Sequence, residues 1–313
     1  MSTLSVRLRA GDLVEVKTPE EILQTLDGDG TLDRLPFMPE MVAFCGRRFR
    51  VSGRVHQTCS TGPPNPYAEM RVFREDDVVL LDGLRCSGAA HDGCQKDCAI
   101  FWREAWLRKV EPGAEPVADA GAGDRLRSRL KTMAGPTTYF CQSSELIKAT
   151  ESLSRREQFK KCARDVRAGD CGALRMAARL ALWVFWKIRR RLVGEYSRGR
   201  AASATPAETL NLQPGDWVEV KPLESIRDTL NASGYNRGLY FTPGMGRACG
   251  RKYQVGGRID RIIVDGSGEM RRMRNTVRLE HSECRCAILN VGGCSRREVN
   301  YWREIWLRRI PTT

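Results

Sequence analysis

The chain has 313 residues, of which 41% are hydrophobic and 29% are charged, and its formal net charge is +14. This balance is that of a soluble globular protein. No apolar run reaches the roughly 18 residues of a transmembrane helix, and the first residues lack the apolar stretch of a signal peptide. We therefore expect a cytoplasmic, bacterial protein whose 12 cysteines are reduced thiols or metal ligands rather than disulfides.

The first hundred residues predict short strands interrupted by helical turns. Strands are expected at 13–16, 47–52 and 78–81, and helical turns at 19–26 and 39–44. Thr18 and Pro19 are typical of a helix start. Short strands with Gly-rich turns favour a small antiparallel barrel similar to SH3-like barrels, a likeness of fold that carries no function. Trp102 and Trp106 are expected to pack its core.

The first copy of this unit carries a set of candidate metal ligands. They are Cys59, Cys86, Cys94 and Cys98. Four thiolates suit a tetrahedral zinc ion or an iron–sulfur cluster. The spacing lacks the Cys-x-x-Cys pair usual for structural zinc, and the loop from Cys86 to Cys98 is too small and polar to pack by itself. A metal would order it. The alternative is reduced cysteines packed as small apolar residues.

Two further residues are secondary candidates for this site. His91, inside the same loop, could be a ligand, a proton carrier or an exposed loop residue, and we favour exposure. Cys141 lies outside both copies and could reach the site as an extra ligand. Neither the loop nor its surroundings contains a recognised catalytic motif.

Residues 113–209 predict a basic helical connector, with 19 Lys and Arg against 10 Asp and Glu. Ser154 and Glu157 form a capping box at the start of one helix, and a second helix is expected at 172–196. Its stretch 174–193 combines Trp and Phe with arginines, the composition of a helix on a membrane surface or of a helix docked on a neighbouring domain. We favour docking, with a solvated basic face.

The last hundred residues repeat the first unit. Gly-Asp-Leu-Val-Glu-Val-Lys at 11–17 returns as Gly-Asp-Trp-Val-Glu-Val-Lys at 215–221, and Trp-Arg-Glu-Ala-Trp-Leu at 102–107 returns as Trp-Arg-Glu-Ile-Trp-Leu at 302–307. The predicted domains are 1–112, 113–209 and 210–313. The fold class is therefore mainly β with helical insertions, two duplicated SH3-like barrels joined by a helical connector.

The cysteine set changes in the second copy. Cys98 corresponds to Glu298 and His91 to Val291. The remaining candidates for a second metal site are His281, Cys284, Cys286 and Cys294. They fit either a zinc site or a site that has decayed.

The repeated blocks, with the cysteine-rich loop between them and the Tyr-x-Cys-Gln segment at 139–142, resemble a bacterial protein family without an established activity. The resemblance implies the duplication and implies no particular reaction.

The sequence leaves three functions open. The first is a non-enzymatic accessory or scaffold protein that holds zinc or an iron–sulfur cluster and works with a protein partner. The second is an enzyme that uses this metal for redox or Lewis-acid chemistry. The third is a nucleic-acid-binding protein acting through the basic connector and barrels, which we rank last because the aromatic residues favour core positions.

Overall fold

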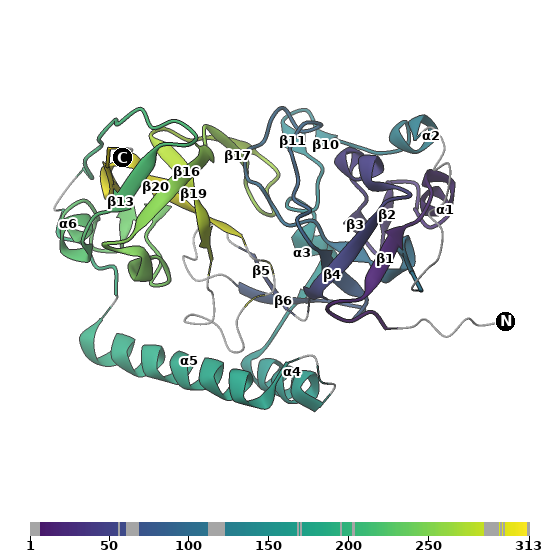
Figure 1. Cartoon of the computed structure of the whole chain (residues 1–313), viewed down its shortest axis with the longest axis horizontal. Helices are drawn as coiled ribbons and strands as arrows, with labels where there is room; N and C mark the ends of the chain where they lie inside the picture. Colours follow the sequence, from purple (N-terminus) through teal and green to yellow (C-terminus); the bar gives the residue numbers. More distant parts are fainter. Residues whose placement is uncertain are drawn as a thin grey trace. The chain divides into compact units, whose positions relative to one another are not determined.

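The computed structural model describes residues 7–55, 57–60, 69–111, 123–167, 169, 171–194, 196–201, 204–284, 294, 296 and 298–311. The described chain is mostly β, with several sheets and a half-barrel, as the mainly β prediction required (Figure 1). It divides into two compact units. The first contains Met1–Ala173, Ile263–Met270 and Cys294–Arg296, and the second contains Leu174–Ile262, Arg271–Gly293 and Arg297–Thr313. Two short pieces of the C-terminal copy therefore belong to the first unit.

A five-stranded antiparallel sheet with the order β8-β7-β4-β1-β9 organises the first unit. Its strands are β1 (Leu13–Val16), β4 (Arg48–Arg54), β7 (Val78–Leu81), β8 (Trp102–Arg103) and β9 (Leu107–Lys109). Every residue of β7 is buried, as its uninterrupted apolar sequence predicts. Helix α1 (Pro19–Leu23) follows β1 and begins with the predicted Thr18 cap, completed by the Glu21 side chain.

The first unit also contains further strands and helices, in chain order. They are β2 (Thr31–Leu32), β3 (Leu35–Pro36), η1 (Pro39–Phe44), β5 (Thr58–Ser60), β6 (Glu69–Phe73), η2 (Glu104–Trp106), α2 (Asp124–Arg127), β10 (Met133–Gly135), β11 (Thr138–Tyr139), α3 (Leu146–Ala149), β12 (Thr150–Ser152) and α4 (Arg155–Arg167). Strands β12, β6 and β5 form a second, three-stranded sheet. The predicted helical turn at 39–44 is confirmed as the 3-10 helix η1.

The second unit repeats the five-stranded order as β20-β19-β16-β13-β21. Its elements are α5 (Ala173–Val193), β13 (Trp217–Val220), α6 (Leu223–Arg227), β14 (Tyr235–Asn236), β15 (Leu239–Tyr240), η3 (Met245–Ala248), β16 (Lys252–Arg258), β17 (Arg261–Ile263), β18 (Met270–Arg272), β19 (Thr276–Glu283), β20 (Val299–Arg303), η5 (Glu304–Trp306) and β21 (Leu307–Arg309). The two sheets correspond strand for strand. Their assignment to SH3-like barrels stays a prediction.

Equivalent aromatic clusters fill the two cores. Phe37 lies edge-on to Trp102 and Trp106, with ring centroids 6.2 and 5.2 Å away. Phe241 stands in the same relation to Trp302 and Trp306, at 6.2 and 5.3 Å. All four tryptophans are fully buried, which confirms their predicted core role. Edge-to-face contacts of this kind stabilise a core beyond the area they bury.

The connector contains two longer helices, as expected. Ser154 and Glu157 make the predicted capping box at the start of α4, the Ser154 amide donating to the Glu157 carboxylate. Helix α5 ends at Val193, close to the predicted end, and only Met176 among its residues is buried. None of the described helices is both long and apolar enough to cross a membrane.

Candidate functional site

The loop between β7 and β8 carries three of the predicted cysteine ligands. Its base is closed by a hydrogen bond from the Cys86 amide to the Cys98 carbonyl at 2.8 Å. Further along, the amides of His91 and Gly93 both donate to the Gly88 carbonyl at 3.0 Å. These bonds fold the loop onto itself although it has almost no apolar side chains.

Gly88 is required at the tightest point of this loop. Its φ is +67°, a left-handed conformation that glycine adopts without steric cost. A Cβ added there would lie 2.0 Å from the carbonyl oxygen of Cys94. The close approach of these two backbone segments places Cys94 beside the base of the loop.

A fourth cysteine, Cys141, is positioned by the residue that follows it. The buried Gln142 side chain accepts a hydrogen bond from the Phe101 amide at 2.9 Å and donates to the carbonyls of Pro36 and Phe101 at 3.0 and 2.9 Å. The Cys141 amide donates to the Ser144 hydroxyl at 2.9 Å. The segment after β11 is thereby fastened against the end of the cysteine loop.

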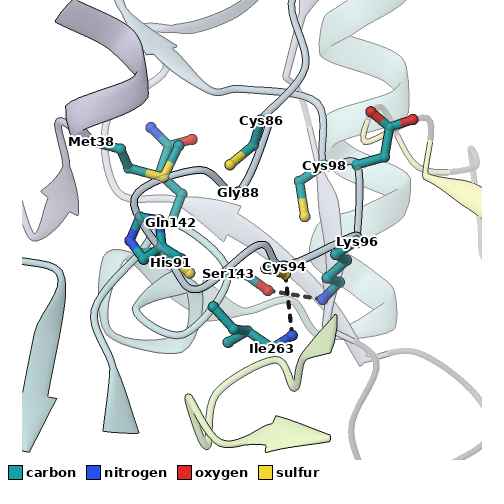
Figure 2. Close-up of a pocket in the computed structure, with 12 residues that line it drawn as sticks. Met38, Cys86, Gly88, His91, Cys94, Lys96, Cys98, Gln142, Ser143 and Ile263 are labelled. Carbon is teal, nitrogen blue, oxygen red and sulfur yellow. Dashed lines mark hydrogen bonds between the residues drawn. The ribbon is translucent and has the colours of Figure 1, made fainter. Parts of the chain in front are cut away.

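The four cysteines border one pocket of the first unit, with an open volume of about 380 Å³ that includes some solvent. The residues that line it are Met38, Cys86, Gly88, His91, Cys94, Lys96, Asp97, Cys98, Cys141, Gln142, Ser143 and Ile263. Figure 2 shows the thiols of Cys86, Cys94 and Cys98 entering this space from different stretches of the loop. Cys94 and Cys141 are buried, and Cys86 and Cys98 are half-buried.

Cys94 also accepts a backbone hydrogen bond. The amide of Ile263, in a piece of the C-terminal copy that belongs to the first unit, donates to its Sγ at 3.3 Å (Figure 2). An amide directed at a cysteine sulfur stabilises negative charge on it.

The structure places the other predicted ligands elsewhere. Cys59 is buried in β5 and does not line this pocket; its Sγ lies 3.4 Å from the Sγ of Cys294. Cys294 belongs to the first unit, whereas His281 and Cys284 belong to the second, where His281 is exposed. Cys286 lies outside the described residues. The second metal site stays a prediction.

His91 is buried, so the favoured prediction of an exposed loop residue was wrong. Its Nδ1 lies 2.7 Å from Glu40 Oε1 and its Nε2 lies 3.0 Å from the Phe140 carbonyl oxygen. An ionised Glu40 and the carbonyl are both acceptors, an arrangement that favours a protonated ring in which both nitrogens donate. Sequence reasoning missed this burial because Glu40 and Phe140 are each about fifty residues away in the chain.

The pKa values of this pair agree with the geometry. Burial by itself would lower the pKa of His91, but the hydrogen bond and charge of Glu40 outweigh it and the pKa lies above its ordinary value. Burial would raise the pKa of Glu40, and the hydrogen bond and charge of His91 hold it below its ordinary value instead. The pair is thus a salt bridge at the wall of the pocket.

The thiols themselves are weak acids. Burial, reinforced by the nearby Glu40 carboxylate, raises the pKa of Cys86 far above its ordinary value. Burial also raises the pKa of Cys141. These two thiols are therefore held in the protonated form, whereas the thiolate is the form that reacts and binds metal.

A buried cluster of charged side chains lies behind the side of the pocket formed by Lys96 and Ser143. The Asp265 carboxylate accepts hydrogen bonds from Lys96, from Ser143 and, at 2.9 and 3.0 Å, from both terminal nitrogens of Arg296. Burial would raise the pKa of Asp265, but the charges of Arg296 and Lys96 keep it far below its ordinary value. Lys96 lines the pocket and is held by Ser143 at 2.8 Å.

No protein-family model, no curated protein and no solved structure matches the chain. The site must therefore be interpreted from its own residues. Within the part of the chain that the structure describes, no three His, Cys, Asp or Glu side chains form a group that could hold a metal ion.

Several residues of the site were not among the sequence-based candidates. They are Met38, Glu40, Lys96, Gln142, Ser143, Asp265 and Arg296. Lys96 and Gln142 adjoin predicted cysteines and could have been suspected from that. Asp265 and Arg296 give no signal, because the sequence does not reveal that these pieces of the second copy belong to the first unit.

Proposed function

We propose that this chain binds a cysteine-ligated iron–sulfur cluster in the first unit, with Cys86, Cys94, Cys98 and Cys141 as its ligands. The observation that carries the proposal is the convergence of these four residues, from two separate segments, on one pocket. Four cysteine thiolates are the usual ligand set of both two-iron and four-iron clusters.

The shape of the site favours a cluster over a single zinc ion. Tetrahedral zinc with sulfur ligands needs sulfur atoms only about 3.8 Å apart, which follows from zinc–sulfur bonds of about 2.3 Å. The four cysteines border one pocket, and among the described residues no three ligand side chains lie close enough together to hold a single metal ion. A cluster has several irons, so its thiolates attach at different points around a larger body.

Charged groups of both signs lie at the pocket. Lys96 and His91 line it together with Asp97, and Lys96 and His91 are paired with the buried Asp265 and Glu40. The raised thiol pKa values mean that ligation displaces protons from cysteine, as metal binding to thiols generally does.

Electron transfer or structural support is the role we favour for the cluster. Four protein ligands leave no coordination position for a substrate, unlike catalytic metal sites. His91, the nearest candidate for a general base, uses both ring nitrogens within the protein. We therefore place the chain among accessory proteins that carry a cluster, rather than among enzymes that act on substrate at the metal.

Iron and acid-labile sulfide analysis of anaerobically purified variants tests the proposal. Cys141→Ala should abolish cluster binding and Cys59→Ala should leave it unchanged, which separates this ligand set from the one the sequence favoured. Cys249→Ala, at a half-buried cysteine of the second unit, is a matched control. Retention of iron in Cys141→Ala together with its loss in Cys59→Ala would contradict the proposed ligands.

A second candidate function is peripheral binding of α5 to an anionic membrane. Exposed apolar side chains recur every three or four residues along this 21-residue helix and so share one face. They are Leu174, Ala177, Ala178, Ala181, Val184, Phe185, Ile188 and Leu192. The helix carries six Arg and Lys residues and no Asp or Glu. An apolar stripe on a purely cationic helix is typical of a helix lying in a lipid headgroup region.

Flotation with vesicles tests this second candidate. The full chain should float with vesicles rich in phosphatidylglycerol and stay behind with neutral phosphatidylcholine vesicles. Phe185→Glu should abolish flotation, whereas Phe159→Glu, at an exposed aromatic residue of α4, should retain it. Equal flotation of the two variants, or binding to DNA instead of vesicles, would contradict lipid binding.

A further inference from the structure

The contact between Cys59 and Cys294 joins one residue from each of the two predicted metal sites. The two Sγ atoms lie 3.4 Å apart, although 235 positions separate the residues in the chain. Both residues belong to the first unit. Neither lines the four-cysteine pocket.

Strand pairing and hydrogen bonds from Arg296 hold the two ends of this contact. Cys59 is buried in the middle of β5, where it pairs with Met70 of β6. The amide of Arg296 donates to Cys294 Sγ at 3.3 Å, and its guanidinium donates to the Cys59 carbonyl at 3.0 Å. Arg296 is itself anchored by Asp265. The hydrogen bonds of the buried Arg296 thus hold both cysteines in place and keep the two sulfurs in contact.

We propose that Cys59 and Cys294 form a redox-active thiol pair that closes to an intramolecular disulfide. A disulfide bond is about 2.05 Å long, so each sulfur would move by only about 0.7 Å from its present position. Rotation of the two cysteine side chains accounts for most of this movement, since hydrogen bonds from Arg296 hold the Cys59 carbonyl and the Cys294 sulfur.

The difference in exposure assigns a role to each thiol. Cys294 is half-buried and Cys59 is buried, so an oxidant reaches Cys294 first. A peroxide oxidises the Cys294 thiol to a sulfenic acid and is itself reduced, hydrogen peroxide yielding one water. The Cys59 sulfur then attacks Cys294 Sγ, the sulfur–oxygen bond breaks, and hydroxide leaves with the Cys59 proton as a second water. Two thiols and one peroxide give one disulfide and two waters.

Peptide mapping of the full chain after treatment with one equivalent of hydrogen peroxide tests this pair. Alkylation under denaturing conditions should reveal a linked peptide containing Cys59 and Cys294, with the loss of two hydrogen atoms. In Cys59→Ser, Cys294 should remain a sulfenic acid that dimedone traps. In Cys294→Ser, Cys59 should stay reduced, because the accessible partner is gone.

Cys249→Ser is the matched control and should form the same linked peptide as the unaltered chain. Alkylation of Cys59 and Cys294 as separate thiols after peroxide treatment would overturn the proposal, as would a bridge from Cys294 to any other cysteine. Iron and sulfide content measured on the same samples keeps this result separate from the cluster, which uses different cysteines.

Discussion

The two five-stranded sheets share their frame and differ in what they attach to it. Strand β7 pairs with β8 over two residues, and the chain pairs once more at the isolated bridge between Arg85 and Ala99, where the cysteine loop begins. In the second unit, strand β19 itself continues to Glu283, which pairs with Val299 of β20. The described ends of the two loops therefore differ, because a single bridge closes the first and a continuous strand leads into the second.

A second difference concerns the buried arginine beside each tryptophan pair. Arg103 is paired with the Asp77 carboxylate, whereas Arg303 donates to the Arg274 carbonyl and the Thr276 hydroxyl. Burial, together with the charge of Arg237, lowers the pKa of Arg303 to about 10. The first unit thus keeps a charge pair at a position where the second uses neutral acceptors.

The largest expected effect on cluster binding comes from replacing a cysteine of the first copy with the residue at the equivalent position of the second copy. Cys98→Glu, which copies Glu298, should abolish cluster binding because one of the four thiolate ligands is removed. Iron and sulfide analysis and the visible absorption spectrum check it. Retention of the full iron content would mean that Cys98 is not a ligand and that the two loops differ less than proposed.

Gly88→Ala should also reduce cluster content to a minor fraction. The new Cβ would meet the Cys94 carbonyl at 2.0 Å, so the loop must open. Gly93→Ala is the matched control, since Gly93 has the same φ of +67° but no atom within 4 Å of its Cβ position. It carries only the backbone strain of about 1 kcal/mol. Equal iron content in the two variants would contradict the tight packing of the loop.

Because the two aromatic cores have the same arrangement, Phe37→Ala and Phe241→Ala should lower the free energy of unfolding by equal amounts. Each removes a buried ring from between two tryptophans and should lower the free energy of unfolding of its own unit by about 3–5 kcal/mol. Denaturant titration followed by tryptophan fluorescence measures both. A difference of more than about 1–2 kcal/mol between the two losses would show that the cores are less alike than their geometry indicates.

Asp265→Asn should destabilise the first unit by about 3 kcal/mol, because it leaves Lys96 and Arg296 buried without their counter-charge. The exposed Asp260→Asn serves as a control and should change stability very little. Thermal unfolding of both variants, resolved by unit, provides the measurement. An unchanged transition of the first unit in Asp265→Asn would show that the ionic cluster contributes nothing.

The smallest expected effect is an acid dependence of the same cluster. The folded pKa of Asp265 is lowered, so its contribution to stability is present above the unfolded value of about 3.9 and is lost as the pH falls below it. The difference in unfolding free energy between the unaltered chain and Asp265→Asn should therefore shrink below about pH 4. A difference that stays constant down to pH 2 would contradict this assignment.

Local signals in the sequence predicted several features of the sheets and their cores. The Thr18 cap, the apolar run of β7 and the repeated tryptophans each depend on neighbouring residues, and each was confirmed. The loop cysteines Cys86, Cys94 and Cys98 were also brought to one pocket.

What the sequence could not predict depends on contacts between distant segments. The sequence favoured Cys59 over Cys141 because Cys141 lies outside both copies of the repeat, but hydrogen bonds of the Gln142 side chain hold Cys141 at the pocket. The buried His91 is held by Glu40, which is distant in the chain. Lys96, at the pocket, is held by Asp265, which lies in the other copy of the repeat. No local pattern encodes these pairings, since each requires the folded arrangement of both segments.

The central claim is that Cys86, Cys94, Cys98 and Cys141 of the first unit hold an iron–sulfur cluster. It is tested most directly by iron, zinc and acid-labile sulfide analysis of the anaerobically purified chain, together with its absorption spectrum before and after dithionite. We predict equal amounts of iron and sulfide, two or four of each per chain, and a brown absorption that dithionite bleaches. A colourless protein with one tightly bound zinc, or with no metal after reconstitution with iron and sulfide, would contradict the claim.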